Sequence, residues 1–303
     1  MVFFYPILYK ILSYIMFSFC NSIIKYLIGG SYFMIENPVP IYIIVMYSYM
    51  FGAFFLFPYF YLKKYIFKFK IKYFLLHILR LVFFVSGFLL WGLSFKFMSI
   101  VQVVIISFGS YLLSIFGSSF FLKEKITLNR FICLFISIFG VFFTSLHLNN
   151  LYNEHVFDFV FLLPIFSSFM FSFEKLVSRK LILLKEDGVF LVFYIMFLTP
   201  FFCIIPVIKY GWFFPDVNHF FYFFVLGFCS ILSIYFYNKA YVYSEVTFLM
   251  PFFPFKLILS CVFGYLFFGE ILNFFNLFVW VFILIFCIIL LYYEKRFDLL
   301  KIL

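Results

Sequence analysis

Charged residues are scarce in this sequence: they make up 11% of its 303 residues, whereas 67% are hydrophobic and 29% aromatic. A soluble domain of this length needs far more polar surface to cover its exterior. The composition therefore excludes an ordinary soluble domain, and lipid is the expected surrounding of most of the chain.

Paired cysteines are also lacking. The six cysteines stand singly in apolar runs, and no CxxC pair occurs. This pattern indicates neither a metal site nor a disulfide framework, so the cysteines are expected to be packing residues. They are Cys20, Cys133, Cys203, Cys229, Cys261 and Cys287.

Motifs of enzymes are missing as well. The four histidines show no HExxH spacing, and no GxSxG turn or Walker loop is found. A membrane metalloenzyme, an intramembrane hydrolase and an ATP-driven pump are therefore disfavoured. A channel needs a filter sequence or a pore-lining ring, and neither is recognisable. We predict no enzyme activity, no catalytic residue, no metal and no cofactor.

The net charge of +10 could indicate a nucleic-acid partner, but the basic residues do not form one stripe. They gather in short segments between apolar runs, which is the pattern of membrane loops. Acidic lipid headgroups are the expected counter-charge, and no nucleic-acid partner is predicted.

Ten apolar segments are long enough to cross about 30 Å of hydrocarbon. The N-terminal segment lacks a basic leader and a small-residue cleavage site, so it is interpreted as the first span. The predicted spans are 7–28, 40–62, 74–96, 100–122, 129–147, 157–178, 189–209, 219–241, 247–268 and 273–293.

Loop charge predicts the orientation of these spans, with both termini in the cytosol. The loops on the predicted cytosolic side hold Lys63, Lys64, Lys68, Lys70, Lys72, Lys123, Lys125, Arg130, Arg179, Lys180 and Lys185. The opposite loops hold Lys25, Lys96, Lys209, Glu36, Glu154, Asp158 and Asp216. No retention signal identifies the membrane, and an endomembrane or a plastid-type membrane stays open.

An internal repeat relates the fourth and ninth predicted spans. Ser94 precedes Glu124 by 30 residues, and Ala240 precedes Glu270 by the same interval, which gives a repeat offset of 146. Each half then contains five spans, and an odd number means that the second half enters the membrane inverted. The prediction is an all-α integral membrane protein of ten helices, with repeats at 1–148 and 149–303. Inverted repeats are typical of alternating-access carriers.

On these residues the chain resembles the drug/metabolite transporter superfamily, whose members carry two EamA-like repeats of five helices. Each repeat of that family ends in an apolar helix, a "GE"-type ending and a final span. "FFLKEKIT" (120–127) and "LFFGEIL" (266–272) fit this ending, although Lys123 stands where glycine is usual. The resemblance covers nearly the whole chain.

Lys256 lies inside the ninth predicted span, about ten residues from its start, which is close to 14 Å along a helix. A charged side chain near the bilayer centre is costly, so it usually faces a cavity or a partner. The acidic residues fall in loops or at span ends, and the deepest, Glu174, is followed by its own Lys175. Lys256 is therefore a candidate ligand for an anion; a snorkelling or paired structural lysine is the alternative.

The motif around Lys256 is similar to the nucleotide-sugar and sugar-phosphate branch of the superfamily. In that branch a basic residue precedes the "FGE"-like ending by 14 residues, as Lys256 precedes Glu270, and a Tyr-Asn pair lies in the preceding span, as in "YNKA" (237–240). The resemblance implies that Lys256 holds a phosphate, with Asn238 and Lys239 nearby. "FK" stands where the sugar-phosphate transporters carry Lys-Arg, and the Asn-to-Ala spacing is one shorter.

Three further polar residues in predicted spans are weaker candidates. Asn21 and Gln102 could bind a ligand or form an interhelical hydrogen bond. Arg80 could be a ligand, but an interfacial anchor is the commoner role. Pro251 and Pro254 indicate either a hinge or a kink near Lys256.

The sequence thus predicts a secondary carrier of a small anionic metabolite, such as a sugar phosphate or nucleotide sugar, working by antiport. A carrier of amines, drugs or amino acids is the alternative, and a polytopic membrane scaffold is the alternative outside transport. A carrier should have a central cavity lined by both halves, whereas a scaffold should be packed shut. The expected partners are a small-molecule substrate and the lipid bilayer, and a homodimer is left open.

Overall fold

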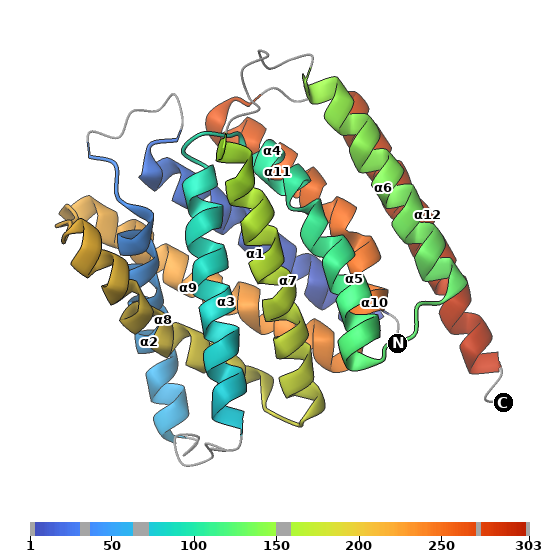
Figure 1. Ribbon diagram of the computed structural model, residues 1–303, viewed down its shortest axis with the longest axis horizontal. Coiled ribbons are helices and arrows are strands. Elements are labelled where there is room, and N and C mark those ends of the chain that lie inside the picture. Colours follow the sequence, from blue (N-terminus) through green and yellow to red (C-terminus); the bar gives the residue numbers. More distant parts are fainter. Residues whose placement is uncertain (1–3, 31–36, 63–72, 150–158, 271–273, 301–303) are drawn as a thin grey trace.

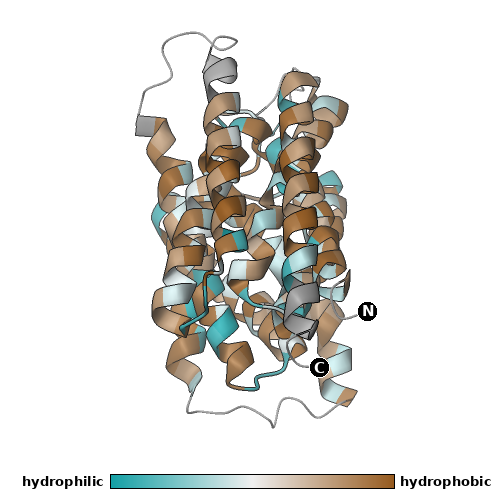
Figure 2. Ribbon diagram, turned by 90° about the vertical axis from the view of Figure 1, so that its right-hand side faces the viewer, coloured by the Kyte–Doolittle hydropathy of each residue, from teal (hydrophilic) through white to brown (hydrophobic). Residues whose placement is uncertain are grey.

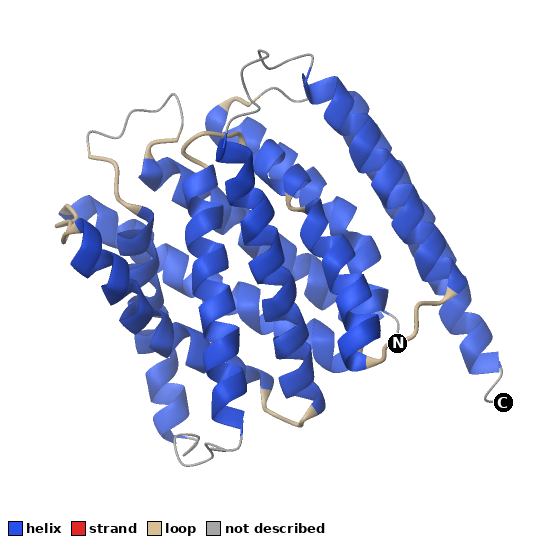
Figure 3. Cartoon of the chain, in the orientation of Figure 1, coloured by secondary structure: helices blue, strands red, loops and turns tan. Residues whose placement is uncertain are grey.

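The computed structural model describes residues 4–30, 37–62, 73–149, 159–270 and 274–300, and in this part of the chain it contains helices and loops but no strand (Figure 3). The first half contains α1 (Phe4–Ile28), α2 (Ile41–Leu62), α3 (Phe74–Ser94), α4 (Ile100–Ile106), α5 (Phe108–Leu122) and α6 (Leu128–Asn149). The second half contains η3 (Phe159–Phe161), α7 (Leu162–Leu183), α8 (Gly188–Tyr210), α9 (Val217–Tyr243), α10 (Val246–Leu249), η4 (Met250–Phe252), α11 (Phe253–Phe268) and α12 (Phe274–Leu300).

Each of the ten predicted spans corresponds to one of these helices or to a broken pair of them. The fourth span consists of α4 and α5, and the ninth consists of α10, η4 and α11. Eight spans are long and apolar enough to cross a membrane. The sixth, α7, differs because its second half carries four charged residues, Glu174, Lys175, Arg179 and Lys180. The apolar part of α6 in the described residues is the shorter stretch Leu128–Thr144. The protein is a multi-pass membrane protein, and apolar residues run along most of each helix (Figure 2).

The helices pack in pairs that repeat between the halves. α1 packs along α9, and its counterpart α7 packs along α3, while α2 lies against α8. α6 and α12, the last helices of the two halves, run side by side at one edge of the bundle (Figure 1). The partnership of α1 with α9 thus has its equivalent in that of α7 with α3, as an inverted repeat requires.

The broken spans show the same correspondence residue by residue. Ser99 caps the start of α4 and Glu245 stands at the start of α10, while Lys123 and Gly269 end α5 and α11 with the left-handed φ values of 57° and 61°. Both pairs are 146 residues apart, the offset predicted from the sequence. The two spans run in opposite directions through the bundle (Figure 1). The boundary between the predicted repeats, 148/149, stays a prediction because residues 150–158 lie outside the described residues.

We call the end of the bundle where α1 begins and α12 finishes the terminal end, and the opposite end the far end. Lys25 and Glu270 lie at the far end, whereas Glu124 and Arg179 lie at the terminal end. Several residues used to predict orientation, the lysines of 63–72 together with Glu36, Glu154 and Asp158, lie outside the described residues. The cytosolic position of the terminal end therefore stays a prediction.

Candidate functional site

A cavity of about 110 Å³ lies in the middle of the bundle, between the two halves. Its walls come from α1, α3, the α4–α5 break, α7, α8, α9 and α11. Rings of Tyr14, Phe17, Phe84, Trp91 and Phe171 form much of the lining. The scaffold alternative expects a bundle that is packed shut, whereas this one contains a central space that both halves line.

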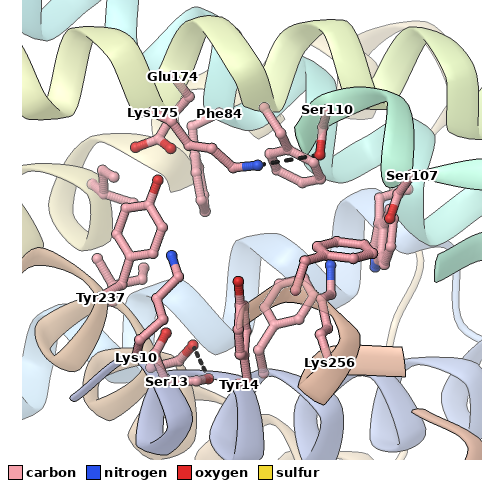
Figure 4. Close-up of a pocket in the computed structure, with 17 residues that line it drawn as sticks. Lys10, Ser13, Tyr14, Phe84, Ser107, Ser110, Glu174, Lys175, Tyr237 and Lys256 are labelled. Carbon is pink, nitrogen blue, oxygen red and sulfur yellow. Dashed lines mark hydrogen bonds between the residues drawn. The ribbon is translucent and has the colours of Figure 1, made fainter. Parts of the chain in front are cut away.

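Three lysines project into the cavity from three different helices: Lys10 from α1, Lys175 from α7 and Lys256 from α11 (Figure 4). The Nζ of Lys10 donates to the hydroxyl of Tyr241 at 3.3 Å, and the Nζ of Lys175 donates to the hydroxyl of Ser110 at 3.1 Å. Lys256 lies over the rings of Phe17 and Trp91, 4.5 and 4.6 Å from their centroids. In the part of the chain that the structure describes, no carboxylate lies within ion-pair distance of any of the three lysines.

Glu174 is the one carboxylate among the residues that line the cavity, and it is already paired. The Nε of Arg80 lies 3.1 Å from Glu174 Oε1, and the hydroxyl of Ser178 donates to the same oxygen at 2.5 Å. The Arg80 side chain is 1% exposed and also donates to the carbonyl of Leu191. Since the charges of Arg80 and Glu174 cancel, the three lysines leave the cavity with a positive surplus.

Packing at a helix break brings Lys256 to this place. Pro251 lies in the short helix η4, and Pro254 stands in the first turn of α11, where a missing N–H costs nothing. Lys256 follows in the same turn, and its carbonyl accepts from the hydroxyl of Ser260 at 2.8 Å. The prolines therefore separate two helical pieces, and the lysine projects from the start of the second piece.

Of the six binding residues predicted from the sequence, the structure places Lys256 on the cavity wall and the other five away from it or behind it. Asn238 is fully buried against α8, where its amide donates to the carbonyl of Gly188 at 3.3 Å, and Lys239 lies over the Tyr235 ring. Gln102 forms a capping box with Ser99 at the start of α4.

Asn21 and Arg80 lie one layer behind the cavity lining. Asn21 is fully buried, and its Oδ1 accepts a hydrogen bond from the Trp91 indole at 3.1 Å. Arg80 does not line the cavity itself, but it forms an ion pair with Glu174, which does. Both residues hold a cavity side chain in position, so a direct contact with a ligand stays a prediction for each.

Lys10 and Lys175 are site residues that the sequence did not identify. The sequence contains an indication of the position of each. Lys10, Tyr14 and Phe17 recur at intervals of four and three and therefore share one face of α1. Lys175 follows Glu174 directly, and adjacent residues on a helix do not face each other, so Glu174 cannot be its partner by default.

Residues 5–146 match the EamA-like transporter family. This match covers the first five spans and agrees with the family resemblance drawn from the sequence.

This chain matches proteins that are named as transporters. It is 24% identical over 194 residues to a protein of Rickettsia felis named S-adenosylmethionine uptake transporter, a match that covers 64% of this chain and 64% of that protein. It is 23% identical over 205 residues to a riboflavin transporter of Brucella anthropi, covering 66% of this chain and 70% of that protein. The first of these matches spans less than two thirds of the relative's length.

A crystal structure of another protein superposes on this chain with a TM-score of 0.70 and covers 96% of both chains at 12% identity. At that identity the likeness concerns the fold alone. None of these proteins is named as a sugar-phosphate or nucleotide-sugar transporter.

The matched glutamates of the two repeats have a defined structural role in the bundle. Glu124 accepts hydrogen bonds from Arg179 Nε at 3.1 Å and from the backbone N–H of Thr247, at the start of α10, at 3.2 Å. Glu270 is paired with Lys25 and accepts from the backbone N–H of Ile100, at the start of α4, at 3.1 Å. Each glutamate of one half therefore binds a helix start or a basic residue of the other half, where negative charge is favoured by free N–H groups.

Proposed function

We propose that the protein is a secondary carrier that moves a small anionic metabolite across the membrane by alternating access. The observation that carries this proposal is the set of three lysines, Lys10, Lys175 and Lys256, that face one central cavity without a described carboxylate partner. A buried ammonium group is costly unless an opposite charge compensates it. An anionic ligand in the cavity supplies that compensation.

The place of the cavity supports the transport part of the proposal. It lies between the two inverted halves, near the middle of the spans, which is where carriers of inverted-repeat architecture bind substrate. The match of residues 5–146 to a transporter family and the names of the relatives support the same activity.

A sugar phosphate or nucleotide sugar, exchanged against a second anion, is the finer form of the proposal. The interval between Lys256 and Glu270 and the tyrosine of "YNKA" support it, because Tyr237 and Lys256 both line the cavity. The positions of Asn238 and Lys239 do not add to it, since neither residue lines the cavity.

A carrier of an uncharged ring compound is the second candidate, and the aromatic lining is the observation that favours it. Rings of Phe17, Phe84, Trp91 and Phe171 offer stacking surfaces to a planar ligand. Riboflavin, the compound named for one relative, is such a ligand. In this case bound anions, instead of the substrate, must compensate the positive charges of the three lysines.

The test is exchange in proteoliposomes of radiolabelled phosphate, sugar phosphates and nucleotide sugars, beside riboflavin and S-adenosylmethionine. We expect wild type to exchange at least one of the anions, and Lys256→Gln to reduce that exchange by about tenfold or more, because a charge-assisted contact is lost. Lys209→Gln, which removes an exposed lysine in the last turn of α8, is the matched control and should exchange like wild type. Exchange of the uncharged or cationic compounds alone contradicts the proposal.

A further inference from the structure

Two of the cavity lysines, Lys10 of α1 and Lys256 of α11, lie beside opposite ends of one face of α1. Lys10, Tyr14 and Phe17 project from the same side of α1, and the Nζ of Lys10 lies 5.1 Å from the centre of the Tyr14 ring. The Nζ of Lys256 lies 4.5 Å from the centre of the Phe17 ring. Lys10 and Phe17 are seven positions apart, which at 1.5 Å per residue is about 10 Å along the helix. Since one ammonium group lies beside each end of this face, we take their separation to be of that order.

The wall between these two lysines carries no charge. Tyr14 lies between them on the floor of the cavity (Figure 4), and the rings of Phe17 and Trp91 lie beside Lys256. Lys175 faces them from α7, where Ser110 is its hydrogen-bond partner. A ligand with a single acidic group can reach Lys10 or Lys256, and it leaves the other ammonium uncompensated in an apolar wall.

The separation limits the spacing of acidic groups in the ligand. A hydrogen bond from an ammonium to an acidic oxygen is about 3 Å long, so two such bonds leave about 4 Å between the oxygens of two acidic groups. A chain of two or three carbon atoms spans that gap. From this arrangement we propose that the substrate is a short molecule with a separate acidic group at each end, one bound by Lys10 and the other by Lys256, with Lys175 above the chain.

This inference rests on the proposed function and names the substrate class of the same site. It also makes Lys10 and Lys175 determinants of specificity. Lys10 selects for the second acidic group. Its loss should therefore abolish the preference for ligands with two acidic groups over ligands with one, while transport of anions continues. Lys175 contacts the middle of the ligand, so its loss should weaken ligands with one and with two acidic groups alike.

Matched pairs of probes test the preference. Succinate is compared with 4-hydroxybutyrate, and 3-phosphonopropionate with 3-hydroxypropylphosphonate, because each pair differs only in a second acidic group. Binding is measured as the ligand-dependent rise in melting temperature of the purified full-length protein. We expect the member with two acidic groups to bind about tenfold or more tightly in at least one pair.

Variants then connect that preference with the named residues. Lys10→Gln should bring the affinity ratio within a pair close to one, Lys10→Arg should retain the preference, and Lys209→Gln should leave it unchanged. The melting temperature without ligand reports whether each variant is folded. Equal binding of both members of each pair by wild type overturns the inference, and so does a preference that survives Lys10→Gln.

The same experiment separates this inference from the proposed function. If the protein binds and exchanges anions but shows no preference within either pair, the anion carrier stands and the substrate with two acidic groups is wrong. If none of the four probes binds and proteoliposomes exchange no phosphate, sugar phosphate or nucleotide sugar, both the inference and the proposed function are overturned.

Discussion

Glu124 and Glu270 occupy equivalent positions in the two repeats, but the two ends of the bundle that they hold together are unequal. At the terminal end, Arg179 binds Glu124, and Arg130 binds both Glu245 and Glu294, so three ion pairs join the first half to the second. At the far end, the pair of Lys25 and Glu270 is the one ion pair between halves that the described residues form. Exposed hydrogen bonds from Asn37 to Asp216 and from the hydroxyl of Tyr42 to the carbonyl of Gly211 also lie there.

The difference has a consequence for a carrier that opens its two ends in turn. Opening an end requires the contacts between the halves at that end to break, and the other end must stay closed meanwhile. Because the terminal end carries more ion pairs, we expect its opening to cost more than opening the far end. A ligand in the cavity must supply part of this difference through stronger binding to the state with the terminal end open.

The largest effect is expected from Glu124→Gln. It leaves the guanidinium of Arg179 buried without its carboxylate, and breaking a buried pair in this way typically costs about 3–5 kcal/mol. The free energy of unfolding, measured by denaturant titration in detergent micelles, should fall by that order. Arg179→Met in the same background should recover part of the loss, since no buried charge remains. A change below about 1 kcal/mol, as for an exposed pair, contradicts a structural role for this contact.

A smaller effect on stability is expected from Glu270→Gln. The ammonium of Lys25 sits on a flexible stem in the last turn of α1 and can turn toward the headgroups, so the cost should be about 1–3 kcal/mol. The same change should open the far end more often. Ser22, which is 2% exposed and lies one turn before Lys25, is the reporter.

A cysteine at Ser22 should therefore react faster with a water-soluble maleimide in the Glu270→Gln background than in wild type. Glu124→Gln is the matched control, because it loosens the opposite end and should not raise labelling at Ser22. If the cysteine at position 22 reacts at the same rate in the Glu270→Gln and Glu124→Gln backgrounds, the inequality of the two ends is wrong.

The spans could be predicted from hydropathy, because the length of an apolar segment is a local property of the sequence. The inverted repeat could be predicted from Glu124 and Glu270, because their offset of 146 is also visible in the sequence. Lys256 was found because a charge in the middle of a span is rare. Lys10 was missed because it stands near the start of the first predicted span, where a lysine ordinarily reaches the headgroups. Which residues a cavity brings together depends on packing between helices, which no single span encodes.

The "YNKA" stretch shows the same limit on a finer scale. Successive residues of a helix point about 100° apart, so three neighbours cannot face one cavity. Tyr237 lines the cavity, whereas Asn238 turns to Gly188 and Lys239 to Tyr235. The motif therefore predicted the correct turn of α9, but the orientation of the helix about its axis determines which residue of that turn lines the cavity.

The smallest effect concerns the residues that precede the two glutamates. Lys123 and Gly269 both have left-handed backbone conformations, with φ values of 57° and 61°, and the N–H of each following glutamate closes the helix end on Ser118 or Gly264. Glycine adopts this conformation without strain, whereas a residue with a Cβ does not. Lys123→Gly should therefore raise the free energy of unfolding by up to about 1 kcal/mol. Gly269→Lys, the reverse exchange at the equivalent position, should lower it by a similar amount. If the two exchanges shift stability in the same direction, the two helix ends are not equivalent, and the correspondence between the repeats does not extend to their caps.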